Sequence, residues 1–366
     1  MSGSDEFPPP ADPGPPASTV VPRGGDRRTR RRRRRRIVLS VLGVFVLVLV
    51  GLVAFYEIEA HPFGGPGRQV VLTVQNNEST GAAIDALAKD GVVASAFAFR
   101  LSEIVHGTPT VAPGSYLFHQ NESFSTVRSI FSGGPNVFLM DVPEGFTLAE
   151  VTKRVNELPI PVAGSFARAL TSGTMTSPYS SGGSEPLEGD IATGQYLVLP
   201  REKATTLLAQ MVDRFNKQAA SLHLDSAATA LGITPAQLVV VASIVEKEGE
   251  FVQNMGKVSR VIYNRLAKGS PLQMDSTILY SLGQDGGTVT AADLKINTPY
   301  NTYLHTGLPP TPICAPSRTA LSSAAHPTPG QWLYFQLVSK DGTEQFSDTF
   351  AGQLAAEALA KSRGLP

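Results

Sequence analysis

Three acidic residues, Glu246, Glu248 and Glu250, lie close together at the end of an apolar stretch. A carboxyl group donates a proton when it is protonated and accepts one when it is ionised, so such residues are candidates for general acid–base chemistry. In a helix of about 100° per residue, Glu248 falls in the arc of Val241 and Ile244, whereas Glu246 and Glu250 fall on another side. Glu248 is therefore the carboxylate with the distinct environment.

A helix must position Glu248 in this way, and the sequence signals where that helix starts. Thr234 and Gln237 have the spacing of a capping box, and Pro235 suits the first helical position. Beside aliphatic neighbours a charged carboxylate loses solvation, so the pKa of Glu248 should rise and the group can act as a general acid near neutral pH. The alternative is that the helix frays before Gly249 and Glu248 simply reaches water.

Other common catalytic groups do not form recognisable patterns. Cys314 is the only cysteine, which excludes an intrachain disulfide and a thiolate zinc cluster. The six histidines are scattered without the spacing of metal ligands. No phosphate-binding glycine loop and no Ser-His-Asp signature stands out. We therefore expect neither a metal nor another cofactor.

The N-terminal part of the chain indicates a membrane protein. The apolar run from Ile37 to Tyr56 carries no charge and is long enough to cross about 30 Å of hydrocarbon as a helix. A cleaved signal peptide is less consistent with the length of this run and with the residues that follow it. We expect residues 1–36 to form a disordered basic tail in the cytoplasm and the chain after Glu57 to lie outside the cell membrane, which the chain crosses once.

The charges are strongly segregated along the chain. It has 31 basic and 31 acidic residues, and ten of the basic ones are arginines between Arg23 and Arg36. Such a run beside a membrane span fixes the topology and contacts anionic lipid. Nucleic-acid binding is the alternative, but the arginines need no such partner here.

Outside the membrane, a small α+β module is expected over residues 68–135. Its expected elements are a strand at 68–75, helices at 79–89 and 94–106, a strand at 112–118 and a helix at 123–131. A larger α+β domain should follow over residues 136–366. Its expected elements are a strand, turn and helix within 136–158, a loop at 172–185, helices at 204–222, 254–266 and 350–361, and a hairpin that turns at 341–342. Arg260 and Arg265 are expected to be solvated or ion-paired.

A stretch of the second domain is rich in amides, hydroxyls, tyrosines and prolines. Sugars need flat apolar faces together with many fixed donors and acceptors, and prolines hold such groups at a low entropic cost. The alternative is a well-ordered surface loop whose tyrosines pack on the body of the domain. The candidate sugar-binding residues are Gln273, Asp275, Thr277, Tyr300, Asn301 and Tyr303.

Several of these segments resemble one known family. The segments are ASIVEKE at 242–248, VIYNRL at 261–266, LQMDSTILY at 272–280, TPYNTY with GLPPTPI within 298–313, and AAHP at 324–327. In order and spacing they resemble the YceG-like family of endolytic murein transglycosylases. Weaker similarity extends over residues 37–366, and the block from 242 to 327 is the specific part.

The resemblance implies a LysM-like module near residues 68–135, a transglycosylase domain at 136–366 and Glu248 as the catalytic acid. It implies cleavage of the β-1,4 bond between N-acetylmuramic acid and N-acetylglucosamine in glycan strands near the membrane, with 1,6-anhydro ends, so that elongation of nascent strands ends. Wall-synthesis polymerases and the elongation or division complex are the implied partners. The sequence departs from the family pattern at 190–194 and 313–317, which affects the expected details of the groove.

Two other functions remain open at this point. One is a hydrolytic muramidase in which a second carboxylate, such as Asp275, activates water. The other is an inactive, membrane-anchored scaffold that binds the wall through its small module.

Overall fold

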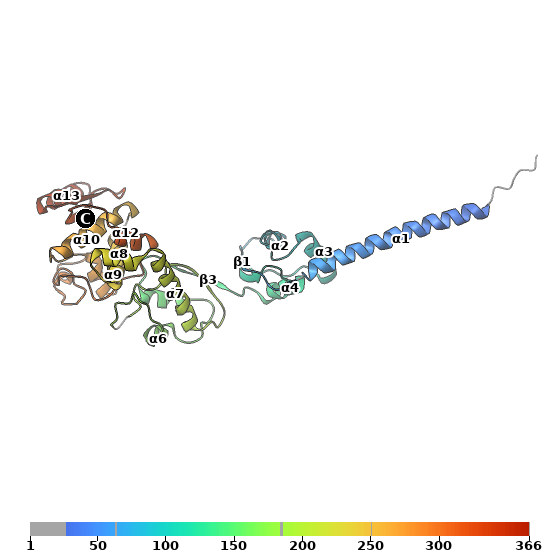
Figure 1. The fold of residues 1–366 in the computed structure, drawn as a ribbon, viewed down its shortest axis with the longest axis horizontal. Helices are drawn as coiled ribbons and strands as arrows, with labels where there is room; N and C mark the ends of the chain where they lie inside the picture. The colour runs from blue at the N-terminus through green and yellow to red at the C-terminus, as the bar shows by residue number, and fades with distance from the viewer. Residues whose placement is uncertain (1–26, 63, 184–185, 250, 366) are drawn as a thin grey trace, which may run out of the picture.

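The computed structural model describes residues 27–62, 64–183, 186–249 and 251–365. Its first element is a long helix, α1 (Arg27–Ala60), which projects from the rest of the molecule as a rod (Figure 1). Within α1, residues Arg32–Ala60 are long and apolar enough to cross a membrane. The helix begins at Arg27, so the expected disorder of residues 27–36 differs from the structure. Arginine is a good helix former and no proline or glycine separates it from the apolar run.

The small module comes next and contains the elements that the sequence predicts. They are β1 (Gln69–Val74), α2 (Thr80–Lys89), α3 (Ala96–His106), β2 (Gly114–His119) and α4 (Phe124–Gly133). The two strands pair antiparallel, with Leu72 opposite Tyr116. Each helix starts after a serine whose side chain accepts a backbone hydrogen bond: Ser79, Ser95 and Ser123. These caps explain why the helix starts could be predicted.

Aromatic side chains fill the core of this module. Phe99, Tyr116, Phe118 and Phe131 are all fully buried there. The end of α1 joins the same core through Tyr56, whose ring packs on the module. The module therefore lies directly against the extracytoplasmic end expected for the span.

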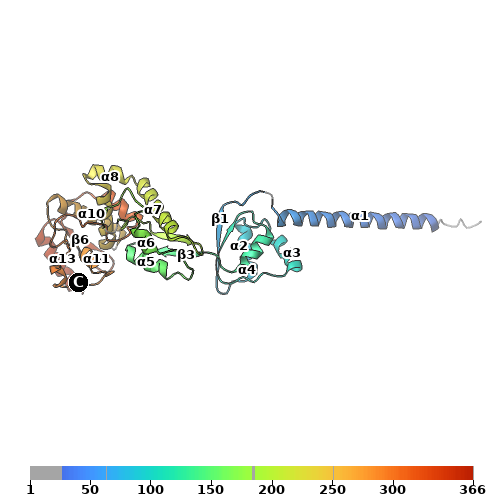
Figure 2. The same cartoon turned by 90° about the horizontal axis from the view of Figure 1, so that it is seen from below.

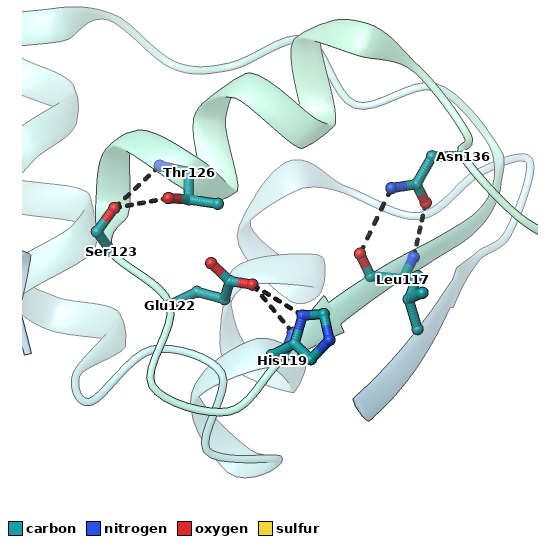
Figure 3. Close-up of polar contacts among 6 residues, drawn as sticks. All are labelled: Leu117, His119, Glu122, Ser123, Thr126 and Asn136. Atoms are coloured by element: carbon teal, nitrogen blue, oxygen red, sulfur yellow. Dashed lines mark hydrogen bonds and ion pairs between the residues drawn. The ribbon is translucent and has the colours of Figure 1, made fainter. Parts of the chain in front are cut away.

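Polar side-chain contacts lie near the end of the small module, next to the segment that enters the second domain (Figure 3). The Asn136 side chain pairs with both backbone groups of Leu117, accepting from its N–H at 2.7 Å and donating to its carbonyl at 3.4 Å. Near the start of α4, Glu122 accepts from the backbone and ring of His119. Asn136 thus extends the β2 edge up to the first strand of the second domain.

The second domain begins with a layer around two paired strands. This layer contains β3 (Phe138–Val142), α5 (Leu148–Asn156), α6 (Phe166–Thr171), β4 (Gly194–Val198) and α7 (Ala204–Ser221). Strands β3 and β4 are antiparallel, with Met140 opposite Tyr196. Thr147 and Glu150 form a capping box at the start of α5, where the sequence predicts the helix to begin.

A helical layer follows, built around α9. Its elements are α8 (Leu224–Leu231), α9 (Pro235–Glu248), α10 (Val252–Ala267), α11 (Asp275–Ser281), a 3₁₀ turn (Asp293–Lys295), α12 (Arg318–Ala325), β5 (Tyr334–Leu337), β6 (Glu344–Ser347) and α13 (Phe350–Ser362). Helices α8, α10, α11 and α12 all contact α9, whose residues from Leu238 to Val245 are buried. The predicted capping box at Thr234 and Gln237 is present. Helix α9 is therefore the rigid element that carries Glu248.

The architecture is α+β, with three two-stranded antiparallel sheets among the described residues. The small module and the second domain follow one another along the molecule (Figure 2). The predicted hairpin at 341–342 is present as β5 and β6. Residues 1–26 and Glu250, for which the sequence makes predictions, lie outside the described residues.

Candidate active site

Glu248 is the last residue of α9, and it faces the start of α11. The Ser276 hydroxyl donates to Glu248 Oε1 at 2.7 Å, and the Ser276 backbone N–H reaches the same oxygen at 3.3 Å. Among the described residues, no hydrogen bond to Glu248 Oε2 is found, and Glu248 as a whole is partly exposed and lines two cavities. The carboxyl group therefore has one fixed oxygen and one oxygen that is available to a ligand.

The surroundings of Glu248 raise its pKa above the ordinary value for a glutamate. The main cause is desolvation, because protein atoms surround the partly exposed carboxyl group closely. The hydrogen bonds from Ser276 oppose this rise, the charge of Asp275 adds to it, and the charge of Arg265 lowers the pKa. The direction agrees with the sequence-based argument from the aliphatic arc of α9.

Two cavities adjoin Glu248. A cavity of about 590 Å³ opens toward the β5–β6 hairpin, and a second of about 320 Å³ opens toward Lys247 and Tyr280. Glu248 and Asp275 line both of them. A third cavity, of about 510 Å³, shares lining residues with the second, including Thr147 and Tyr280. The three cavities are connected through shared lining residues and form one groove, whose two arms, the 590 Å³ cavity and the joined 320 and 510 Å³ cavities, meet at Glu248 and Asp275.

Three of the predicted sugar-binding residues share the larger cavity with Glu248. They are Gln273, Asp275 and Tyr303. The Tyr303 hydroxyl donates to Asp275 Oδ1 at 2.7 Å, which fixes both side chains beside the catalytic candidate. Burial and the nearby Asp275 charge raise the pKa of Tyr303, so this phenol stays protonated as a donor.

Tyr300 lies in a different part of the groove. It lines the 510 Å³ cavity together with Tyr280 and Glu188, and the two tyrosine rings have centroids 5.0 Å apart. The Tyr300 hydroxyl also bonds with Thr311 at 2.8 Å. Tyr300 therefore lies in the far arm of the groove and not beside Glu248, and its sugar-binding role stays a prediction.

The structure corrects the roles predicted for Thr277 and Asn301. Both side chains are fully buried, so neither is able to touch a substrate. The Thr277 hydroxyl donates to the Met274 carbonyl at 2.7 Å, and the Asn301 amide donates to the carbonyls of Leu294 and Ile296. These residues stabilise the loops that form the groove, because buried polar groups need internal partners.

Sequence reasoning missed Ser276 and misjudged Arg265. Arg265 is only 9% exposed and makes no ion pair among the described residues. It donates to the Leu333 carbonyl at 2.6 Å and lies over the Tyr334 ring, 5.1 Å from its centroid. The expectation of a solvated or ion-paired arginine was therefore wrong. Apart from Met274, the remaining cavity residues come from the hairpin and α13, whose proximity to Glu248 no local sequence pattern indicates.

The neighbouring Glu246 and Lys247 have partners of their own. Glu246 Oε2 accepts from the backbone N–H of Ser317, the N-cap of α12, at 2.8 Å. Lys247 pairs with Asp285 at 2.6 Å. Both contacts attach other segments to the last turn of α9, so these side chains act as structural supports for Glu248.

The departures from the family pattern lie mostly behind the groove. Of residues 190–194, Asp190 is fully buried, and burial raises its pKa to about 8. Of residues 313–317, Ile313 lines the 320 Å³ cavity and its N–H donates to Ser243 Oγ at 3.0 Å. Ile313 also ends the family-like segment GLPPTPI, and residues 314–317 do not line this cavity. Among the described residues, no three His, Cys, Asp or Glu side chains gather in a way that could hold a metal ion.

Comparisons with known proteins point to one family. A sequence model of the YceG-like family matches residues 72–358. A protein of Streptococcus pneumoniae serotype 2 (strain D39 / NCTC 7466), named endolytic murein transglycosylase, is 28% identical over 229 residues, which are 55% of this chain and 40% of that protein. A protein of Bacillus subtilis (strain 168) with the same name is 40% identical over 113 residues, 31% of each chain. The alignments thus span less than half of either relative.

A solved structure has the same fold. The crystal structure of a YceG-like protein from Listeria monocytogenes superposes with a TM-score of 0.55 and covers 78% of this chain and 98% of that chain. The sequence identity is 22%, so the likeness concerns the fold alone.

Proposed function

Because the chain belongs to the YceG-like family, we propose that it is a membrane-anchored endolytic murein transglycosylase with Glu248 as its catalytic acid and base. The substrate is a peptidoglycan strand, cut at the β-1,4 bond between N-acetylmuramic acid and N-acetylglucosamine. The observation that carries this proposal is the free Oε2 of Glu248, placed between the two arms of a groove. The names of the curated relatives agree with it.

The two oxygens of Glu248 have different tasks in this mechanism. Ser276 occupies Oε1 through two donors, so the proton of the neutral acid resides on Oε2. From there it passes to the departing glycosidic oxygen as the bond to C1 of the muramic acid breaks. The raised pKa keeps this proton in place closer to neutral pH than an ordinary glutamate would.

The same carboxylate then acts as the base. It takes the proton of the muramic acid C6 hydroxyl while O6 bonds to C1 and closes the 1,6-anhydro ring. Atoms and charge balance, since the acid loses one proton and regains one. The nucleophile belongs to the substrate, so one carboxyl group suffices, in contrast to the two-carboxylate arrangement of most glycosidases.

A groove with two arms favours cleavage inside a strand. Sugars on one side of the scissile bond occupy the 590 Å³ cavity, and those on the other side occupy the 320 and 510 Å³ cavities. Tyr303 and Gln273 serve the first arm, and Tyr300 with Tyr280 serves the second. An enzyme that trims only chain ends also holds sugars on both sides of the bond it cuts, so the endolytic assignment rests on the room in both arms together with the names of the relatives.

The location of the enzyme follows from α1. We propose that the apolar part of α1 crosses the cell membrane once, with the arginine run on anionic lipid in the cytoplasm and the catalytic domain outside. This places the groove near newly made glycan, where cleavage ends the elongation of a strand and where wall-synthesis polymerases and the elongation or division complex are accessible. The small module contributes binding to the wall as a LysM-like unit.

Asp275 supports one rival reaction, because it lines the same cavities as Glu248. If Asp275 activates water, the enzyme is a hydrolytic muramidase. Digesting nascent glycan with the full-length protein in water enriched in ¹⁸O separates the two reactions by mass spectrometry. The transglycosylase gives ends that are lighter by one water molecule and carry no ¹⁸O. Reducing ends labelled with ¹⁸O would establish hydrolysis, and intact glycan would support a wall-binding scaffold instead.

A further inference from the structure

Helix α3 of the small module exposes a large apolar face. Phe97 is 71% exposed, Ile104 80% and Val105 79%, and Leu101 adds a further 40%. At about 100° per residue these four side chains fall within an arc of about 100°. The opposite side of the helix, which carries Phe99, packs into the module core. Large apolar side chains gathered on one exposed face are unusual for a surface that meets only water.

The charged residues of α3 leave this face uninterrupted. Arg100 turns toward α2, where it bonds Asp85 at 2.7 Å and the Gly81 carbonyl at 3.1 Å. One carboxylate oxygen of Glu103 is buried. The face is thus apolar along its length, and its polar neighbours are held to the sides.

Helix α3 lies next to the end of α1 that is expected to leave the membrane. Helix α3 contacts the end of α1, and a row of rings connects the two helices: Tyr56 packs on Phe124 with centroids 6.2 Å apart, and Phe124 packs on Phe99 at 5.1 Å. Figure 2 shows α3 on the side of the module from which α1 projects. Since Tyr56 ends the apolar run, the exposed face of α3 lies close to the level at which α1 leaves the membrane.

We propose that α3 is an interfacial helix, with Phe97, Leu101, Ile104 and Val105 inserted into the outer surface of the bilayer that α1 crosses. This inference rests on the proposed membrane anchor. Amphipathic helices bind in this way, with their apolar face at the boundary between headgroups and acyl chains. Helix α1 also exposes large apolar side chains, from Ile37 to Ile58, and its end contacts α3, which favours lipid over a second protein. Attachment through both α1 and α3 would hold the small module against the membrane surface and fix the distance of the catalytic groove from the membrane.

Lipid-depth quenching tests this inference on the full-length protein in liposomes. Cys314 is buried, so a single new cysteine can be labelled selectively with an environment-sensitive fluorophore. Ile104→Cys reports on α3, Leu47→Cys on the middle of the span, and Asp348→Cys on the exposed surface of the catalytic domain. We expect lipids that carry a quencher near the headgroup to quench the Ile104→Cys label several-fold more than the Asp348→Cys label.

The three labels distinguish failure of this inference from failure of the anchor. If lipid quenches the Leu47→Cys label while aqueous iodide quenches the Ile104→Cys and Asp348→Cys labels equally, the anchor stands and the interfacial helix is refuted. If lipid quenches none of them, the anchor fails as well. Energy transfer between Ile104→Cys labels on different chains, without lipid quenching, would mean that a second copy covers the face and would also refute the proposal.

A charge-bearing variant provides a second test. Ile104→Glu with Val105→Glu places two carboxylates on the face without disturbing the core, because both native side chains are exposed. A label at Phe97→Cys in this background should lose its lipid quenching several-fold while the thermal melting of the protein is unchanged. Quenching that persists with the two glutamates would contradict insertion.

Discussion

The last turn of α9 carries two glutamates, Glu246 and Glu248, whose surroundings differ. On the cleft side, Glu248 meets Ser276 with one oxygen and leaves the other open to a groove. On the side toward α12, Glu246 accepts from the backbone N–H of Ser317 and supports the start of α12. The two residues are separated by one position in sequence and have the same chemistry. Their different partners turn one into a candidate catalyst and the other into a structural support.

This comparison shows that burial alone does not make a catalytic acid. Glu188 is only 3% exposed, but its carboxylate already accepts hydrogen bonds from the Leu148 N–H and the Tyr280 hydroxyl, so it serves as a structural group. Burial raises the pKa of Asp190 to about 8, yet this residue does not line any of the three cavities of the groove. Glu248 combines a raised pKa with access to a ligand, and that combination is what general acid catalysis requires.

The largest effect is expected from replacing each glutamate by its amide. Glu248→Gln keeps the size of the side chain but removes the proton that is transferred, so the rate of glycan cleavage should fall by about 10²–10⁴-fold. Glu246→Gln retains an oxygen that accepts from Ser317, so its rate should stay within a few-fold of the wild type. Muropeptide release from nascent glycan measures both. Equal losses of cleavage rate in the two variants would contradict the catalytic role of Glu248 and the structural role of Glu246.

A smaller loss is expected when the support of Oε1 is removed. Ser276→Ala leaves Glu248 without its 2.7 Å hydrogen bond, so the carboxyl group is less well positioned and cleavage should slow by about 10-fold. The hydrogen bond lowers the pKa of Glu248, so its loss should also move the alkaline limb of the pH–rate profile to higher pH. Ser317→Ala is the matched control: it removes a helix cap and should leave the limb in place.

Replacement of Glu246, on the side toward α12, should act mainly on stability. Glu246→Ala removes the acceptor of the Ser317 N–H and should lower the free energy of unfolding by about 1–3 kcal/mol. Denaturant titration measures this change, and the cleavage rate per folded molecule should remain within a few-fold of the wild type. A variant of full stability with a large catalytic defect would place Glu246 in the chemistry.

The smallest effect concerns stability as a function of pH. The folded-state pKa of Glu248 is raised, so its favourable contribution is fully present below the unfolded-state value of about 4.3 and is lost as the pH rises through the folded-state pKa. Glu248→Gln does not titrate. Its stability relative to the wild type should therefore increase between acidic and neutral pH, as followed by thermal melting. A difference that is constant with pH would argue against the raised pKa.

The sequence predicted those parts of the fold that local signals specify. Start signals marked α5 and α9, apolar periodicity marked α2 and α4, and strand patterns with turn residues marked β1 and the hairpin. Strand β4 was missed because its partner β3 is distant in sequence. The short helices α6, α8, α11 and α12 were missed as well, since tertiary packing rather than a long apolar period stabilises them.

The same limit explains the mixed outcome at the site. The long apolar pattern of α9 shows which of its residues face the core, so the environment of Glu248 could be argued from Val241 and Ile244. The short helix α11 has no such pattern. Thr277 was therefore assigned to the groove although it faces the core, and Ser276 was overlooked. Asn301 was chosen for its chemistry, but a loop uses the same amide groups to bond its own backbone.

The most direct test of the central claim is the pH–rate profile of glycan cleavage by the full-length protein in lipid nanodiscs. If Glu248 delivers a proton from a shielded carboxyl group, kcat/KM falls as the pH rises through the raised pKa of Glu248, above the range of an ordinary glutamate, while glycan binding is retained. A rate that stays constant from mildly acidic to alkaline pH would contradict the account.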